Sequence, residues 1–280
     1  MKDAACLFAL LLCAAPASAG PPAEQLARGA YLVRGPMGCG NCHTPLGPEG
    51  FDPARELAGR LVEDGPAFTA HAPNITPAGP VGGWSDAELA RAIREGLRPD
   101  GSLIGPPMPF AAYRGISDDD LAAIVAFLRT LPAVEHSEPA SSYRIPLPPA
   151  WGPPVTQVTA PPQGVSAEYG GYIALSLAHC MECHSPMTET GPDYANALGQ
   201  GGFVFHGPWG EVTAPNITGG PDGIGGYDDA ALAAMITEGI RPDGSPMRPP
   251  MPYGFLAQMT PQDLQAVMLY LRGVPPLPGN

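Results

Sequence analysis

The chain has 280 residues, enough for two domains of ordinary size, and a formal net charge of −13 at pH 7. This acidity argues against nucleic acids and anionic membrane surfaces as partners and favours a docking partner with a basic surface, although acidity also keeps exported proteins soluble. Glycine and proline contribute 36 and 38 residues, which would suggest disorder in a sequence without periodicity.

The first residues predict an exported protein. Residues 1–19 combine Lys2, an apolar run from Ala4 to Ala15 and small residues up to Ala19, which is typical of a signal peptide cleaved after Ala19. The apolar run is too short to cross a bilayer, and no later segment is long and apolar enough. We therefore expect a periplasmic protein with no transmembrane segment in the mature chain. A lipid anchor on Cys13 is the weaker alternative.

A helix is expected next, over Glu24–Arg34, and a similar one recurs over Ala167–Leu177. Gly29 and Gly170 lie at matching positions of the two helices, 141 residues apart. A glycine at the same place in both helices suggests that another helix crosses closely there.

Each of these helices leads to a pentapeptide of the form Cys-x-x-Cys-His. Two thiols three residues apart, followed by a histidine, form the attachment signal for c-type haem, in which the thiols bond the porphyrin and the histidine binds the iron. One copy could be a zinc site or a redox dithiol, but two copies in repeated surroundings favour haem. We predict two covalently bound haem c groups. The attachment residues are Cys39, Cys42, His43, Cys180, Cys183 and His184.

Loops rich in glycine and proline follow both pentapeptides and end in Pro-Asn-Ile-Thr, at residues 73–76 and 215–218. Ser85 and Glu88 then form a capping box that predicts a helix ending near Gly96. The counterpart of this helix is expected over Asp228–Gly239.

The last helix of each repeat has apolar residues at positions i, i+3, i+4 and i+7, starting at Leu121 and at Leu264. Ser117 and Thr260 are the expected N-caps. The whole pattern predicts an all-α protein with two mainly helical domains, at residues 20–134 and 164–280. Residues 135–163 are dense in proline, lack a helical period and are predicted to be a semi-rigid linker.

Among ten methionines, only Met108 and Met251 align with each other in the repeat, and each stands between two prolines that restrict the backbone. They follow His43 and His184 by 65 and 67 residues, enough chain to wrap a porphyrin and return on its other face. We expect them to be the sixth iron ligands, with packing in a stiff loop as the alternative. Ligation by His and Met closes the iron and raises its reduction potential, which suits electron transfer.

Several other residues have less specific expectations. Met247 aligns with Ile104 and is not expected to bind iron. The remaining histidines are expected to be solvated or to form local hydrogen bonds, and they are His71, His136, His179 and His206. Three repeated pairs could contact the porphyrin or could shape their loops, and they are Trp84 with Tyr227, Asn74 with Asn216, and Arg98 with Arg241.

These motifs resemble the class I cytochrome c fold twice over and, more narrowly, the multi-haem cytochrome c subunits of periplasmic alcohol, aldehyde and gluconate dehydrogenases. The resemblance rests on the pentapeptides, Pro-Asn-Ile-Thr, Arg-Pro-Asp-Gly, Pro-Met-Pro and the closing helices, and it covers both predicted domains. It implies that the iron ligands are His43, Met108, His184 and Met251. The chain differs from three-haem members in having two haem motifs and no evident membrane anchor.

The resemblance also implies a function, the transfer of single electrons from a periplasmic dehydrogenase to another cytochrome or a terminal oxidase, with no catalysis by the chain itself. A dihaem redox enzyme of the peroxidase or thiosulfate dehydrogenase type is the alternative. Such an enzyme needs a haem with an exchangeable or unusual ligand, and the matched methionines argue against it. A third possibility is that one haem is a sensor or a structural plug.

Overall fold

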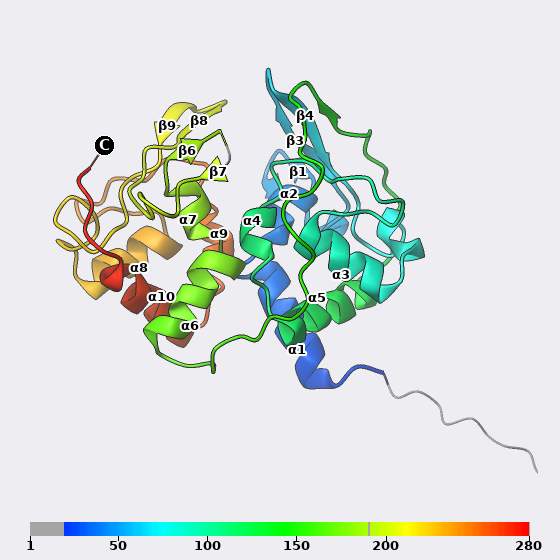
Figure 1. Cartoon of the computed structure of the whole chain (residues 1–280), viewed down its shortest axis with the longest axis horizontal. Coiled ribbons are helices and arrows are strands. Elements are labelled where there is room, and N and C mark those ends of the chain that lie inside the picture. The colour runs from blue at the N-terminus through cyan, green and yellow to red at the C-terminus, as the bar shows by residue number, and fades with distance from the viewer. Residues whose placement is uncertain (1–19, 190, 280) are drawn as a thin grey trace, which may run out of the picture.

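The computed structural model describes residues 20–189 and 191–279, so the predicted signal peptide at 1–19 lies outside the described residues. Figure 1 shows two halves side by side, one built on α1 to α5 and the other on α6 to α10. In this described part, each helix is too short or too polar to cross a bilayer.

The two halves contain their helices in the same order. The N-terminal half consists of α1 (Ala23–Arg34), α2 (Cys39–His43), β1 (Leu46–Gly47), β2 (Gly50–Phe51), η1 (Pro53–Arg55), β3 (Arg60–Asp64), β4 (Phe68–Ala72), η2 (Pro80–Gly83), α3 (Asp86–Glu95), α4 (Phe110–Tyr113) and α5 (Asp118–Thr130). After β5 (Ser142–Tyr143), the C-terminal half consists of α6 (Ala167–Tyr172), the π-helical turn η3 (Ile173–Leu177), α7 (Cys180–Cys183), β6 (Met187–Thr188), β7 (Gly191–Pro192), β8 (Val204–Gly207), β9 (Gly210–Thr213), α8 (Asp229–Thr237), α9 (Tyr253–Leu256) and α10 (Pro261–Gly273).

The predicted helix starts and stops are confirmed where capping residues marked them. The Ser85 side chain accepts a bond from the Glu88 backbone N–H while the Glu88 carboxylate accepts one from the Ser85 N–H, and Gly96 ends α3 at a φ of 67°. Ser117 caps α5 and Thr260 caps α10. Each cap supplies a partner for a backbone N–H that the helix leaves unpaired.

The prediction of an all-α protein is wrong. In the described chain the strands form four small antiparallel sheets, β1-β2, β3-β4-β5, β6-β7 and β8-β9. They lie in segments that the sequence marked as irregular because of their glycine and proline content. Between those turn residues, runs of two to five residues pair with each other and satisfy their own backbone groups. Runs this short carry too little periodicity to be recognised as strands.

The suggestion of close helix crossings at the two matched glycines is confirmed. A Cβ atom on Gly29 of α1 would lie 2.0 Å from the Ala123 carbonyl oxygen of α5. A Cβ atom on Gly170 of α6 would lie 1.9 Å from the Ala266 oxygen of α10. Only glycine lets these helix backbones touch.

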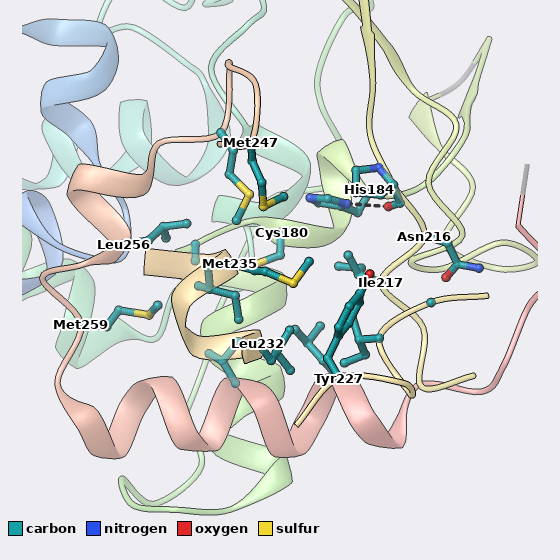
Figure 2. Close-up of a pocket in the computed structure, with 18 of the residues that line it drawn as sticks. Cys180, His184, Asn216, Ile217, Tyr227, Leu232, Met235, Met247, Leu256 and Met259 are labelled. Carbon is teal, nitrogen blue, oxygen red and sulfur yellow. Dashed lines mark hydrogen bonds between the residues drawn. The ribbon is translucent and has the colours of Figure 1, made fainter. Parts of the chain in front are cut away.

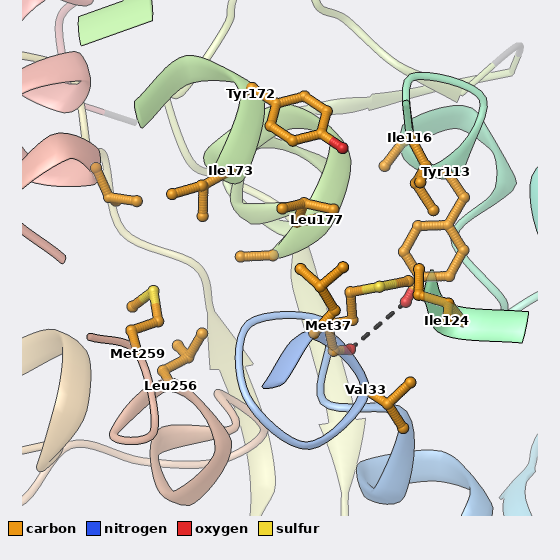
Figure 3. Close-up of a cluster of buried hydrophobic side chains, with 14 of the residues drawn as sticks. Val33, Met37, Tyr113, Ile116, Ile124, Tyr172, Ile173, Leu177, Leu256 and Met259 are labelled. Carbon is orange, nitrogen blue, oxygen red and sulfur yellow. Dashed lines mark hydrogen bonds between the residues drawn. The ribbon is translucent and has the colours of Figure 1, made fainter. Parts of the chain in front are cut away.

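One apolar core runs through both halves. Figure 3 shows Val33, Met37 and Ile124 from the N-terminal half near Ile173 and Leu177 from the C-terminal half, all buried in the same cluster. Burial of shared apolar surface therefore holds the halves against each other.

Polar contacts between the halves are reciprocal. The Tyr31 hydroxyl of α1 donates to Asp263 of α10 at 2.5 Å, and the Tyr172 hydroxyl of α6 donates to Asp120 of α5 at 2.8 Å. Each tyrosine oxygen also accepts a bond from the N-cap backbone N–H of that same helix. The same contact is thus made twice in opposite directions, as across a twofold interface.

Candidate haem sites

The attachment helices α2 and α7 carry the four cysteines of the described chain as free thiols. Burial raises the pKa of Cys39 to about 12 and that of Cys180 to about 11, so both sulfurs stay uncharged at neutral pH. An uncharged sulfur in an apolar setting suits a thioether bond better than a thiolate nucleophile or a thiolate metal ligand.

The two histidines share one hydrogen-bond arrangement, which fixes their tautomer. Nδ1 of His43 lies 2.8 Å from the Pro73 carbonyl oxygen, and Nδ1 of His184 lies 2.8 Å from the Pro215 oxygen. A carbonyl oxygen can only accept, so each Nδ1 carries the proton and each Nε2 keeps its lone pair. Burial lowers the pKa of both rings, an effect partly offset by these hydrogen bonds. Neutral imidazoles oriented in this way are typical metal ligands.

In the C-terminal half, three of the four predicted attachment and ligand residues line one pocket, whose lining does not include Cys183. It has about 870 Å³ of empty space, its open mouth included, and its lining contains Cys180, His184 and Met251. Figure 2 shows the His184 ring and the Met247 side chain reaching the pocket from different parts of the chain, with Leu232 and Tyr227 on another wall. Its apolar walls, free imidazole nitrogen and thioethers fit a haem group.

In the N-terminal half, the equivalent residues are described by their burial rather than by a shared pocket. Cys39 and Met108 are partly buried against the apolar core, as is the Trp84 ring. The association of Met108 with His43 in one site rests on the repeat rather than on a described cavity, and it stays a prediction.

Three further methionines, Met235, Met247 and Met259, line the C-terminal pocket together with Met251. The repeat excluded them, because Met247 aligns with Ile104, and Met235 and Met259 have no methionine counterpart. A repeat reveals only what the halves share, so it cannot find side chains that one site has gained.

The hydrogen bonds of the repeated polar pairs shape their loops, and Asn216 also lines the C-terminal pocket. Asn74 and Asn216 donate at 2.7 and 2.8 Å to carbonyls of the segments that follow α5 and α10. Arg98 and Arg241 donate at 2.8 and 2.7 Å to carbonyls five residues further along their own loops. Of the aromatic pair, Tyr227 does line the pocket.

Of the remaining histidines, His136 has the predicted local hydrogen bond and His206 is solvated, whereas His71 pairs with a residue distant in sequence. His71 and His136 bind the two oxygens of Glu138 at 2.8 and 2.7 Å, and exposed His206 lies 3.9 Å from Glu211.

His179 has a different position, because it joins the two halves. Its ring meets the Tyr113 ring of α4 edge-on, with 5.9 Å between centroids, and its Nδ1 lies 3.3 Å from Glu182. In the other direction, the Phe255 ring of α9 packs on Gly38 and Gly40 of the first attachment helix. Each half thus places an aromatic side chain against the other half's attachment helix, a contact that the sequence did not reveal.

Three of the known proteins that this chain resembles are named as cytochromes or cytochrome subunits. A scan against protein-family models finds no match. The chain is 30% identical over 261 residues to a "Diheme cytochrome c-type" of Cereibacter sphaeroides, covering 85% of this chain and 82% of that protein. It is 29% identical over 278 residues to the "Fructose dehydrogenase cytochrome subunit" of Gluconobacter japonicus, covering 93% of this chain and 54% of that subunit. It is 26% identical over 278 residues to the "Alcohol dehydrogenase (quinone), cytochrome c subunit" of Gluconobacter oxydans, covering 90% of this chain and 55% of that subunit. The chain therefore spans about half the length of these dehydrogenase subunits.

Proposed function

The chain belongs to the family of multi-haem c-type cytochromes, and from this premise we propose that it binds two haem c groups and transfers single electrons between periplasmic proteins. The resemblance predicted from the sequence is confirmed by these relatives, and the relatives named as subunits are cytochrome subunits of dehydrogenases. When bound, haem supplies an iron that gains and loses one electron.

The observation that carries the proposal is the C-terminal pocket, where Cys180, His184 and Met251 line one apolar space. In this proposal Cys180 and Cys183 would hold the porphyrin, and His184, through Nε2, and Met251 would bind its iron. Cys39, Cys42, His43 and Met108 perform the same roles in the N-terminal half. A methionine on each iron leaves no open position for a substrate, which suits a carrier rather than an enzyme.

The partners follow from the relatives and from charge. Because several relatives are cytochrome subunits of dehydrogenases, we propose a periplasmic dehydrogenase as electron donor and another cytochrome or a terminal oxidase as acceptor. The net charge of −13 favours basic docking surfaces on both partners. The contacts of Tyr113 with His179 and of Phe255 with Gly40 connect each attachment segment to the other half, which supports electron exchange between the sites within one chain.

The test is to produce the chain with its leader in a bacterium that attaches haem c, and to count covalent haem per chain. We expect two haems in the wild type. Replacing Cys39 and Cys42 by alanine is expected to remove one, and replacing Cys180 and Cys183 the other. The oxidised protein should be low-spin with a methionine-to-iron absorption band from both sites.

The outcome distinguishes the candidate functions. Fewer than two covalent haems in the wild type would refute the proposal. A high-spin haem that turns over hydrogen peroxide or thiosulfate would replace the carrier with a dihaem enzyme. A haem that no reduced donor can reach would support the third possibility, a sensor or a structural plug.

A further inference from the structure

The segment between the halves is bound to the loop that carries Met108. We name residues 142–153 the linker strap. It begins with β5, whose Ser142 and Tyr143 pair with Thr69 and Phe68 of β4, so the strap continues the β3-β4 sheet. In Figure 1 the chain between β5 and α6 runs past α4, the helix that directly follows the Met108 loop.

Tyr143 fixes the part of the loop that precedes Met108. Its hydroxyl donates to the Pro106 carbonyl oxygen at 3.1 Å. Its ring covers Gly105 so closely that a Cβ atom there would lie 2.3 Å from the ring. The Phe68 ring supports Tyr143 from behind, with centroids 5.9 Å apart.

Trp151 fixes both ends of the same loop. Its Nε1–H donates to the Ile104 carbonyl oxygen at 2.9 Å, and its ring stacks on Phe110 at 5.7 Å between centroids and 19° between planes. The strap is anchored beyond this point by Arg114, whose guanidinium donates to the Pro153 carbonyl oxygen. Met108 thus lies between two points, Ile104 and Phe110, that one tryptophan holds together.

The matching loop of the C-terminal half is bound differently. Arg248 stands where Gly105 stands in the N-terminal half, is exposed, and donates to the Trp209 carbonyl oxygen at 2.5 Å. Tyr253, the counterpart of Phe110, is only partly buried, whereas Phe110 is 2% exposed. The loop around Met251 is therefore the more accessible of the two.

We propose that the linker strap is a positioning element for the first iron site, and that Tyr143 and Trp151 hold Met108 in place so that this site resists external ligands better than the second. The inference rests on the proposed function, because it takes Met108 and Met251 as the sixth ligands. With the strap present at the first site alone, the two sites have the same ligand residues but differ in how easily the methionine is displaced.

The test titrates the full-length oxidised holoprotein with imidazole. Imidazole binding is measured as the loss of the methionine-to-iron absorption band. In the wild type we expect the second haem to bind imidazole at lower concentration than the first. Full-length variants that lack either pair of attachment cysteines assign each titration step to its haem. Trp151→Ala should raise the affinity of the first haem for imidazole by roughly 10- to 100-fold, because it removes a hydrogen bond and an aromatic stack. Tyr143→Phe, which keeps the ring on Gly105, should have a smaller effect of the same sign.

The matched control is Trp209→Ala, a partly exposed tryptophan of the C-terminal half, which should leave the first haem unchanged. Hydrogen exchange supplies a readout independent of ligation: amides of residues 103–110 should exchange more slowly than those of 246–253, and Trp151→Ala should remove this difference. A folded Trp151→Ala protein with unchanged imidazole binding and unchanged exchange would overturn the strap. Fewer than two haems in the wild type would refute the proposed function instead. The hydrogen-exchange comparison would still test whether the strap holds the Met108 loop.

Discussion

At the scale of single residues, the second site contains more candidate ligands than it needs. Met247 and Met251 both line the pocket that holds His184, and only Met251 has a counterpart in the repeat. We expect Met251→Ala to remove about half of the methionine-to-iron absorbance, since one of two sites loses its thioether, and to lower the potential of that haem. Met247→Ala should leave the band intact.

The measurement is the absorption spectrum of the oxidised protein together with a potentiometric titration. Met259→Ala is the control, because Met259 is a buried residue of the same pocket lining that also lacks a counterpart. If Met247→Ala removes half of the band and Met251→Ala leaves it intact, the ligand of this site is the residue that the repeat excluded.

At the scale of elements, the glycine contacts decide how close the helices come. Alanine is the better helix former by about 1 kcal/mol, yet we expect Gly29→Ala and Gly170→Ala to destabilise the fold by about 1–3 kcal/mol. The new methyl group would meet a backbone carbonyl at 2.0 or 1.9 Å, and a backbone cannot rotate away as a side chain can. Denaturant unfolding of the holoprotein measures the change.

Gly273→Ala is the matched control, since Gly273 lies in α10 and a methyl group there would have no other atom within 4 Å. This substitution should be neutral or slightly stabilising. Equal destabilisation by all three substitutions would mean that the crossings tolerate a methyl group and that helix packing does not depend on these glycines.

Elements with a local chemical signal were predictable, and elements without one were not. Ser85 and Glu88 define a helix start through bonds that both residues make within four positions. The strands β8 and β9 depend on pairing across a turn, and four residues each are too few for a periodic signal. The π-helical turn η3 follows α6 without a break in its apolar pattern, so the sequence predicts one continuous helix there.

The site shows the same division. The cysteines and histidines are chemically distinctive and repeat, so the sequence alone singles them out. The carbonyls of Pro73 and Pro215, which set the histidine tautomers, are backbone atoms with no residue-type signal. The strap was missed because a linker without periodicity gives no indication of which loop it contacts, although Tyr143 and Trp151 are both visible in it.

At the scale of the whole molecule, two tyrosines join the halves into one unit, because each donates a hydrogen bond to an aspartate of the other half. Asp120 accepts a hydrogen bond from the Tyr172 hydroxyl and two from Arg28, from Nε at 2.8 Å and from Nη2 at 2.9 Å, and it is 5% exposed. Asp263 is 9% exposed and receives the Tyr31 hydroxyl. Because Asp120 would keep Arg28 as a partner, we expect Tyr31→Phe to cost more stability than Tyr172→Phe, within about 1–3 kcal/mol for a hydrogen bond to a buried charge.

The same contacts predict how the stability depends on alkaline pH. Burial, assisted by the neighbouring aspartates, raises the pKa of Tyr31 and of Tyr172 above the ordinary value of 10.0. A group whose pKa is raised in the folded state stabilises the fold below its unfolded pKa, and that contribution is lost as the pH rises further. Wild-type stability should therefore fall more steeply above about pH 10 than that of the Tyr31→Phe, Tyr172→Phe double variant.

Thermal unfolding of the holoprotein between about pH 8 and about pH 11.5 measures this difference, with Tyr143→Phe as the control, since the Tyr143 hydroxyl donates to the Pro106 carbonyl oxygen and not across the interface between the halves. The double variant should also separate unfolding of the two halves into two transitions, because it removes both reciprocal tyrosine contacts and leaves the apolar interface with the Arg28–Tyr169 hydrogen bond. A single transition with an unchanged alkaline slope would mean that the shared core, and not the reciprocal tyrosine contacts, keeps the two halves together.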